Sequence, residues 1–131
     1  MYELSYTRFM VTDDETSRTG IKEVARVGTS KTDLSAFPPK AKGDMGYQIH
    51  LVQTGQEPDD WKPLGQLGRD ISGVYEIRLS SERSIFRTAY VTKFGDRIVV
   101  LHRWQKKTRA TAQSDKDLIV ARYREAKEKL A

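Results

Sequence analysis

The chain has 131 residues, of which 37% are hydrophobic and 31% charged, and 23 Lys and Arg against 18 Asp and Glu give it a net charge of +5. This composition predicts one soluble domain that buries a core without disulfides, and the lack of cysteine excludes thiol nucleophiles and thiolate metal sites. The longest apolar runs, such as Ile98 to Leu101, are too short for a membrane span, and the N-terminus lacks the pattern of a secretory signal, so we expect a cytoplasmic protein.

The first 29 residues are predicted to form an N-terminal extension with one or two short strands. The strand-like segments are Tyr2 to Val11 and, after a polar loop, Lys22 to Val27. Residues 30–131 are predicted to form the main part of the protein. Together with the extension they are expected to make a single compact domain. Near their start, Ser30 or Thr32 can cap a first short helical turn.

A longer helix is predicted to begin at Pro38 or Pro39 and to run to about Gln53. Proline suits the first positions of a helix, and Gly55 provides a stop signal. Gly43 and Gly46 lie inside the helix, and each weakens it by about 1 kcal/mol relative to alanine. The apolar residues at helical spacing, which we expect to be buried, are Ala41, Met45, Ile49 and Val52.

An antiparallel meander is predicted after the loop 54–60. The first strand, Gly73 to Ser80, alternates apolar residues with Glu76 and Arg78, as a half-buried strand does. Two more strands follow, Phe86 to Thr92 and Arg97 to Trp104, and a glycine-containing turn joins them. The second of these is apolar on both faces near its middle, which predicts a central strand covered by helices on at least one side.

The last helix is predicted to run from a cap at Ser114 to the C-terminus. Its apolar stripe consists of Ile119, Tyr123, Ala126 and Leu130. Together the elements predict an α+β fold, in which an antiparallel or mixed β-sheet of about four strands packs against N-terminal helices and a C-terminal helix.

The positive charge is concentrated in residues 83–109. This segment holds one acid, Asp96, and eight basic residues, which are Arg83, Arg87, Lys93, Arg97, Arg103, Lys106, Lys107 and Arg109. Such a concentration favours binding to a polyanion, with nucleic acid as the first partner to consider. The alternative is a solvated charged face that only keeps the protein soluble.

Sheet geometry predicts that several basic side chains gather on one surface. Residues two apart share a face and neighbouring strands lie about 4.8 Å apart, so Arg78, Arg87 and the pair Lys106 and Lys107 are expected to line one concave surface. Cations clustered there would suit phosphate and would stabilise the charge that develops on a scissile phosphodiester. Trp104 either stacks on an unpaired base or packs into the core.

The two histidines, His50 and His102, lie too far apart in the sequence to indicate a metal site. A lone histidine of this kind is more often structural than catalytic. The sequence also contains no nucleophile elbow, phosphate-binding glycine loop or dinucleotide fingerprint. We therefore expect neither a metal nor a cofactor.

A series of short motifs occurs in the order, and near the spacing, of a known family. The motifs are Asp33-Leu34, Phe37-Pro38, Gln53-x-Gly55-x-x-Pro58, Lys62-Pro63-Leu64, Gly73-Val74-Tyr75-Glu76-Ile77-Arg78, Phe86-Arg87-x-x-Tyr90, Val100-Leu101-His102 and Gln105-Lys106-Lys107-Thr108. In these motifs the chain, from about Ser30 to Leu130, resembles the HigB-like, phage-associated branch of the RelE/ParE toxin superfamily. Of the first 29 residues, Glu23 to Gly28 resembles the family's first strand.

The resemblance implies the toxin of a type II toxin-antitoxin system, which cuts messenger RNA on the ribosome. The implied reaction is a metal-independent attack of a 2′-hydroxyl on the adjacent phosphodiester. Arg87 and Arg78 are implied to hold the scissile phosphate, and Lys106 or Lys107 to neutralise or protonate the leaving oxygen. The implied partners are a helix-turn-helix antitoxin, the ribosome and messenger RNA.

Glu76 occupies a position that is lysine in RelE itself, which leaves the general base open among Glu76, His102 and a lysine. The RNA-binding residues that we predict beside the catalytic ones are Arg83, Arg103, Trp104 and Arg109. Superfamily members that poison gyrase share the fold, so the alternative is a non-catalytic toxin or a phage-borne binding module.

Overall fold

The computed structural model describes residues 4–7, 22–27, 37–81, 83–106 and 111–130, and for residues 4–7, 26 and 106 it describes the backbone alone. Within these residues it contains six strands and two helices. In chain order they are β1 (Leu4–Thr7), β2 (Glu23–Val27), α3 (Pro39–Gln53), β3 (Trp61–Pro63), β4 (Val74–Ser81), β5 (Ser84–Val91), β6 (Arg97–Lys106) and α4 (Gln113–Leu130). Neither described helix is long and apolar enough to cross a membrane.

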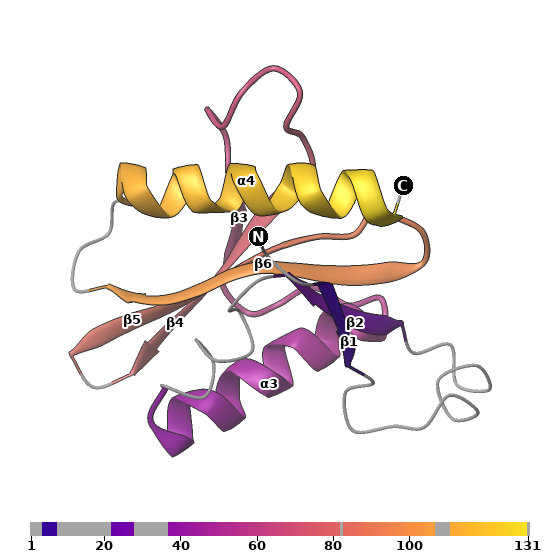
Figure 1. Cartoon of the computed structure of the whole chain (residues 1–131). Coiled ribbons are helices and arrows are strands. Elements are labelled where there is room, and N and C mark those ends of the chain that lie inside the picture. The colour runs from indigo at the N-terminus through magenta and orange to yellow at the C-terminus, as the bar shows by residue number, and fades with distance from the viewer. Residues whose placement is uncertain (1–3, 8–21, 28–36, 82, 107–110, 131) are drawn as a thin grey trace.

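The six strands form one mixed sheet in the order β1-β2-β6-β5-β4-β3. β2 pairs with β6 in parallel, and all other neighbours are antiparallel. Helix α4 lies on one face of the sheet and α3 on the other (Figure 1). The α+β class is therefore confirmed, with two more strands than the four or so that we predicted.

The strand that the sequence predicts as central, β6, lies between β2 and β5. Its four apolar residues, Ile98 to Leu101, are fully buried, with alternate side chains in the cores beneath the two helices. A strand with helices on both faces buries both of its sets of side chains, which explains the continuous apolar run. Helices cover both faces of the sheet, whereas the sequence predicted helices on at least one face.

Helix α3 confirms the prediction for residues 39–53. It begins at Pro39 and ends at Gln53, and Gly55 has a φ of +83°, a backbone conformation that glycine adopts without strain. All four residues of the predicted stripe are buried against β4, β5 and β6. The shorter helical turn predicted at Ser30 or Thr32 lies outside the described residues.

Helix α4 packs on the opposite face of the sheet. Ile119, Tyr123 and Ala126 of the predicted stripe are fully buried and Leu130 is partly buried. The helix begins at Gln113, one residue before the predicted cap, and Asp117 accepts a hydrogen bond from the Gln113 side chain (2.8 Å). The cap prediction was therefore wrong in its detail, although the helix itself is confirmed.

β3 is an element that the sequence analysis did not predict. It has three residues, pairs with β4 as the last strand in the sheet order, and ends in Pro63. Proline has no N–H to donate to a ladder and is tolerated on edge strands, so this segment lacks the usual strand signals. The two strands of the N-terminal extension, β1 and β2, join the same sheet.

Candidate functional site

Three predicted site residues form a row across β4, β5 and β6. Arg78 pairs with Arg87, and Arg87 in turn pairs with Trp104. Directly opposite residues in an antiparallel ladder point to the same side. Trp104 belongs to the core beneath α4, so the row lies on the α4 face of the sheet.

Arg87 is fully buried in an ion pair with Glu76 of the neighbouring strand. The Arg87 Nη1 atom lies 3.0 Å from Glu76 Oε2 and 3.2 Å from Oε1, and both side chains have no exposed area. Thr111 donates a hydrogen bond to Glu76 Oε1 (3.0 Å), and Lys62 Nζ lies 3.6 Å from Oε2. The carboxylate thus has three donors around it, which is what a buried charge requires.

The burial of Glu76 differs from the sequence prediction, in which Glu76 lay on the polar face of a half-buried strand. α4 and the segment that carries Thr111 cover this face, so Glu76 points into the protein rather than into water. The burial of Arg87 likewise shows that the basic segment is not simply a solvated face.

Arg78, in contrast, is half-exposed at the edge of the same face. Its Nη2 atom lies 2.9 Å from Asp60 Oδ1, with 32% and 56% of the two side chains exposed. An exposed ion pair of this kind contributes about 0 to 1 kcal/mol, so the guanidinium can leave it at little cost. Arg78 is therefore accessible to an incoming anion, whereas Arg87 is buried and already bound to Glu76.

A hollow of about 380 Å³ adjoins the network around Glu76. Lys62 and Thr111, which both contact Glu76, are among its lining residues, and Lys116 of α4 supplies a second cation. The remaining lining residues are Pro63, Leu64, Gly65 and Gln66. An open site with two lysines and a hydroxyl suits a phosphate oxygen.

Thr111 and Lys116 were not predicted as site residues, and Lys62 was predicted only as part of a family motif. These residues come from the linker before α4, from α4 itself and from β3. No periodicity connects three such segments, and β3 was not predicted. The motif Lys62-Pro63-Leu64 is the one signal in the sequence that pointed to this place.

His102 is buried between β6 and α4 with both ring nitrogens engaged. Nδ1 lies 3.2 Å from Arg122 Nη1, and Nε2 lies 2.9 Å from Asp115 Oδ1. Arginine has only donors, so Nδ1 accepts and Nε2 carries the proton that it donates to Asp115. The ring also stacks on Trp104, with centroids 4.7 Å apart and planes 10° apart. This arrangement favours the structural role of His102.

The predicted RNA-binding residues and the two predicted catalytic lysines do not form one cluster among the described residues. Trp104 is 7% exposed in the core beneath α4, which favours the packing interpretation over base stacking. Arg103 is buried on the α3 face, opposite Thr88, and Arg83 is exposed in the turn between β4 and β5. Lys106 is paired with Ile85 at the end of β6, and Lys107 and Arg109 lie outside the described residues.

Metal ligands were not expected from the sequence. Within the part of the chain that the structure describes, no group of three or more His, Asp or Glu side chains is arranged to hold a metal ion.

The family described as "Phage derived protein Gp49-like (DUF891)" matches residues 32–124, about seven-tenths of the chain. This family is related to the RelE/HigB toxin-like proteins, which agrees with the resemblance to the toxin superfamily but does not identify the HigB-like branch. The match spans α3, β3 to β6 and most of α4, so it includes Lys62, Glu76, Arg78, Arg87 and Lys116. No curated protein matches the sequence.

Proposed function

The chain belongs to the Gp49-like family of phage-derived proteins, and from this membership we propose that it is a RelE-like toxin that cleaves messenger RNA on the ribosome. The observation that carries the proposal is the cluster of cations on the α4 face. Lys62 and Lys116 line the hollow, and Arg78 lies two residues beyond Glu76 on the same face of β4. A target on the ribosome requires a cytoplasmic protein.

The proposed reaction is a transesterification within the RNA. The 2′-oxygen attacks the adjacent phosphorus, the bond from phosphorus to the 5′-oxygen breaks, and a 2′,3′-cyclic phosphate remains upstream. One group must accept the proton of the 2′-hydroxyl, and another must neutralise or protonate the leaving 5′-oxygen. Fixed cations stabilise the charge that develops between these two events, and one such preorganised contact contributes about 3 kcal/mol.

For Arg87 to bind the scissile phosphate, as the resemblance implies, the phosphate must take the place of Glu76 at a guanidinium that is fully buried in this structure. Glu76 keeps Lys62 and Thr111 as partners when the phosphate takes its place at the guanidinium, so no buried charge is left alone. The carboxylate released in this way becomes the proton acceptor. The leaving oxygen is assigned to Lys106 or Lys107, as the resemblance implies.

The direct test uses purified ribosomes with bound messenger RNA, a polyamine in place of magnesium, and excess chelator. We expect cleavage with a 2′,3′-cyclic phosphate on the upstream fragment and a 5′-hydroxyl on the downstream one. Lys62→Ala and Arg78→Ala should each lower the rate by about 10²-fold. Lys129→Ala, a change of an exposed lysine near the end of α4, is the matched control. A 5′-phosphate downstream, or full activity in both variants, contradicts the proposal.

A non-catalytic toxin is the second candidate, and the engagement of Arg87 and His102 favours it. Both groups are held inside the protein by ion pairs or hydrogen bonds, so in this arrangement neither is presented to a phosphodiester. A gyrase-inhibiting protein of the ParE kind is one example of this class. Arrested growth and DNA damage with intact transcripts would support it over the nuclease.

We also propose that a helix-turn-helix antitoxin, encoded beside this chain, holds the protein inactive. The support is the relation of the family to toxin-like proteins. Co-expression of the neighbouring gene should relieve toxicity, and its product should co-purify with this chain. If the neighbouring product does neither, the antitoxin assignment is wrong.

A further inference from the structure

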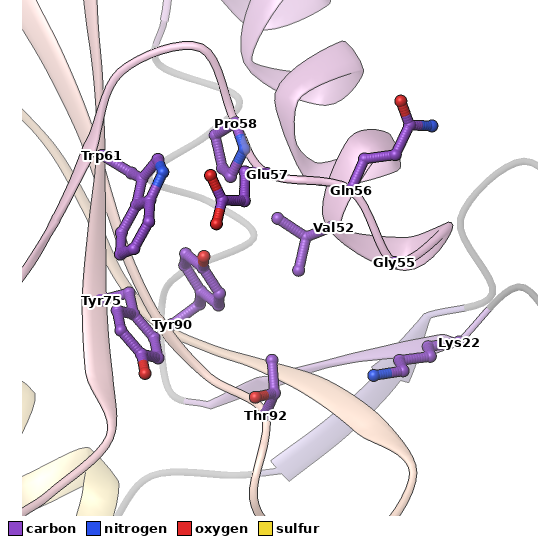
Figure 2. A pocket seen from close by; sticks show the side chains of 10 residues that line it. All are labelled: Lys22, Val52, Gly55, Gln56, Glu57, Pro58, Trp61, Tyr75, Tyr90 and Thr92. Carbon is purple, nitrogen blue, oxygen red and sulfur yellow. The ribbon is translucent and has the colours of Figure 1, made fainter.

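A second hollow, of about 250 Å³, lies on the α3 face of the sheet (Figure 2). Its aromatic side is formed by Trp61 of β3, Tyr75 of β4 and Tyr90 of β5. The Trp61 and Tyr75 rings lie 5.5 Å apart at 75°, and the Tyr75 and Tyr90 rings lie 5.8 Å apart at 37°. The Trp61 and Tyr75 rings meet edge to face, and all three rings line one volume, as aromatic residues do around a bound cation.

The acidic side of this hollow is Glu57, from the loop that follows α3. In Figure 2 its carboxylate points between the rings of Trp61 and Tyr90. Burial, with smaller contributions from the charges of Tyr75 and Glu57, raises the pKa of Tyr90 to about 12, so its hydroxyl stays neutral at physiological pH. Glu57 itself is exposed, and it makes no hydrogen bond or ion pair with any other described residue.

The hollow is lined by one acid, Glu57, and one base, Lys22, and the loop that carries Glu57 is acidic. Residues 54–60 contain three acids and no base, although the net charge of the chain is +5. Asp59 accepts a hydrogen bond from Gln48 (2.9 Å) and Asp60 pairs with Arg78 (2.9 Å), which leaves Glu57 as the acid of this loop that faces the hollow. Lys22 lies beside Thr92 at the end away from Glu57 (Figure 2).

We propose that this pocket binds the side chain of an arginine presented by a protein partner. A guanidinium is planar, stacks on indole and phenol faces, and donates two parallel hydrogen bonds to a carboxylate, which is what Trp61, Tyr75 and Glu57 offer. A nucleotide whose base stacked between these rings would bring its phosphate close to the Glu57 carboxylate, so RNA is the less favoured occupant. The inference does not depend on the nuclease assignment, because the pocket lies on the other face of the sheet.

The test is a titration of the full chain with N-acetyl-arginine N-methylamide, followed by NMR of the tryptophan indole N–H signals. The chain has two tryptophans, and Trp104 lies in the core beneath α4, so its signal serves as an internal reference. We expect a saturable shift of the Trp61 signal alone. N-acetyl-citrulline N-methylamide, the neutral isostere, should bind at least about 5-fold more weakly, since cation–π and charge-assisted contacts are lost.

Matched variants locate the binding. Glu57→Gln should weaken arginine binding about 5-fold, while Glu128→Gln, the same change at an exposed position of α4, should leave it unchanged. Equal binding of the citrulline compound, or no saturable shift, overturns the proposal. A stronger response to cytidine monophosphate would assign the pocket to RNA instead. Tighter binding of free arginine than of its capped form would assign it to a free amino acid rather than to a partner protein.

Discussion

Arg87 and Glu76 form an ion pair with no exposed area on either side chain, so each charge depends on the other. Removing one partner takes from the other its closest opposite charge, and we expect Arg87→Met or Glu76→Leu to lower the free energy of unfolding by about 3 to 5 kcal/mol. The double change Arg87→Met with Glu76→Leu should lose clearly less than the sum. Urea denaturation of the four proteins measures this coupling, and additive losses would show that the two charges do not support one another.

His102 is predicted to stabilise the fold rather than to move protons. His102→Ala leaves Asp115 and Arg122 without their histidine contacts, which should lower the free energy of unfolding by about 2 to 3 kcal/mol. Cleavage per folded molecule should stay within about 2-fold of the original, whereas loss of a general base costs about 10² to 10⁴ in rate. His50→Ala, on the exposed side of α3, is the control and should change stability by less than about 0.5 kcal/mol.

Tyr90 gives the molecule a specific sensitivity to alkali. Burial raises the pKa of its phenol from 10 to about 12 in the folded state. The folded protein therefore holds this proton more tightly, and the stabilisation is complete below pH 10 and is lost as the pH rises from 10 to about 12. The shift of about two pKa units corresponds to about 3 kcal/mol in the free energy of unfolding. Tyr90→Phe should remove this part of the pH dependence of the urea midpoint, and an unchanged profile would contradict the assignment.

Glycines 43 and 55 provide a matched test at the scale of one element, helix α3. A Cβ added at either position has no atom within 4 Å, but Gly55 has a φ of +83°. Gly43→Ala should raise the free energy of unfolding by about 0.5 to 1 kcal/mol, because alanine favours the helix interior. Gly55→Ala should lower it by about 1 kcal/mol, because alanine is strained at positive φ. Thermal melts of the two variants should shift in opposite directions.

The elements that sequence reasoning predicted well are those with an uninterrupted period. The 3.6-residue stripes of α3 and α4 and the apolar run of β6 each report burial through spacing alone. β3 has three residues and a proline, which is too short for any period to appear. The burial of Glu76 was equally hidden, because an alternating strand looks the same whether its polar face meets water or a second helix.

In the candidate site, too, periodicity predicted some features and tertiary packing decided the others. Strand register placed Arg78 and Arg87 on one face, as alternation predicts. The sequence does not indicate that Arg87 pairs with Glu76, nor that Thr111 and Lys116 come to the same place from α4 and its linker. Those contacts depend on how the helix lies over the sheet, which is a tertiary property.

At the scale of the whole molecule, the sheet separates two surfaces of different chemistry. The α4 face carries the hollow with Lys62 and Lys116, and the α3 face carries the aromatic hollow with Glu57. The lysines of the first hollow favour a phosphate-rich ligand, whereas the charges that line the second, Glu57 and Lys22, balance one another. The proposed RNA site and the proposed arginine site therefore use different residues, so occupancy of one should not compete with occupancy of the other.

We propose that this protein cleaves messenger RNA on the ribosome, and mapping transcript 5′ ends in cells distinguishes cleavage from any other cause of toxicity. The chain is induced without its proposed antitoxin and compared with the double variant Lys62→Ala and Arg78→Ala, with Lys129→Ala as the control. We predict new ends in phase with codons inside translated regions, present with the control and lost in the double variant. Arrested growth with intact transcripts, or ends equally frequent in untranslated RNA, would contradict the account.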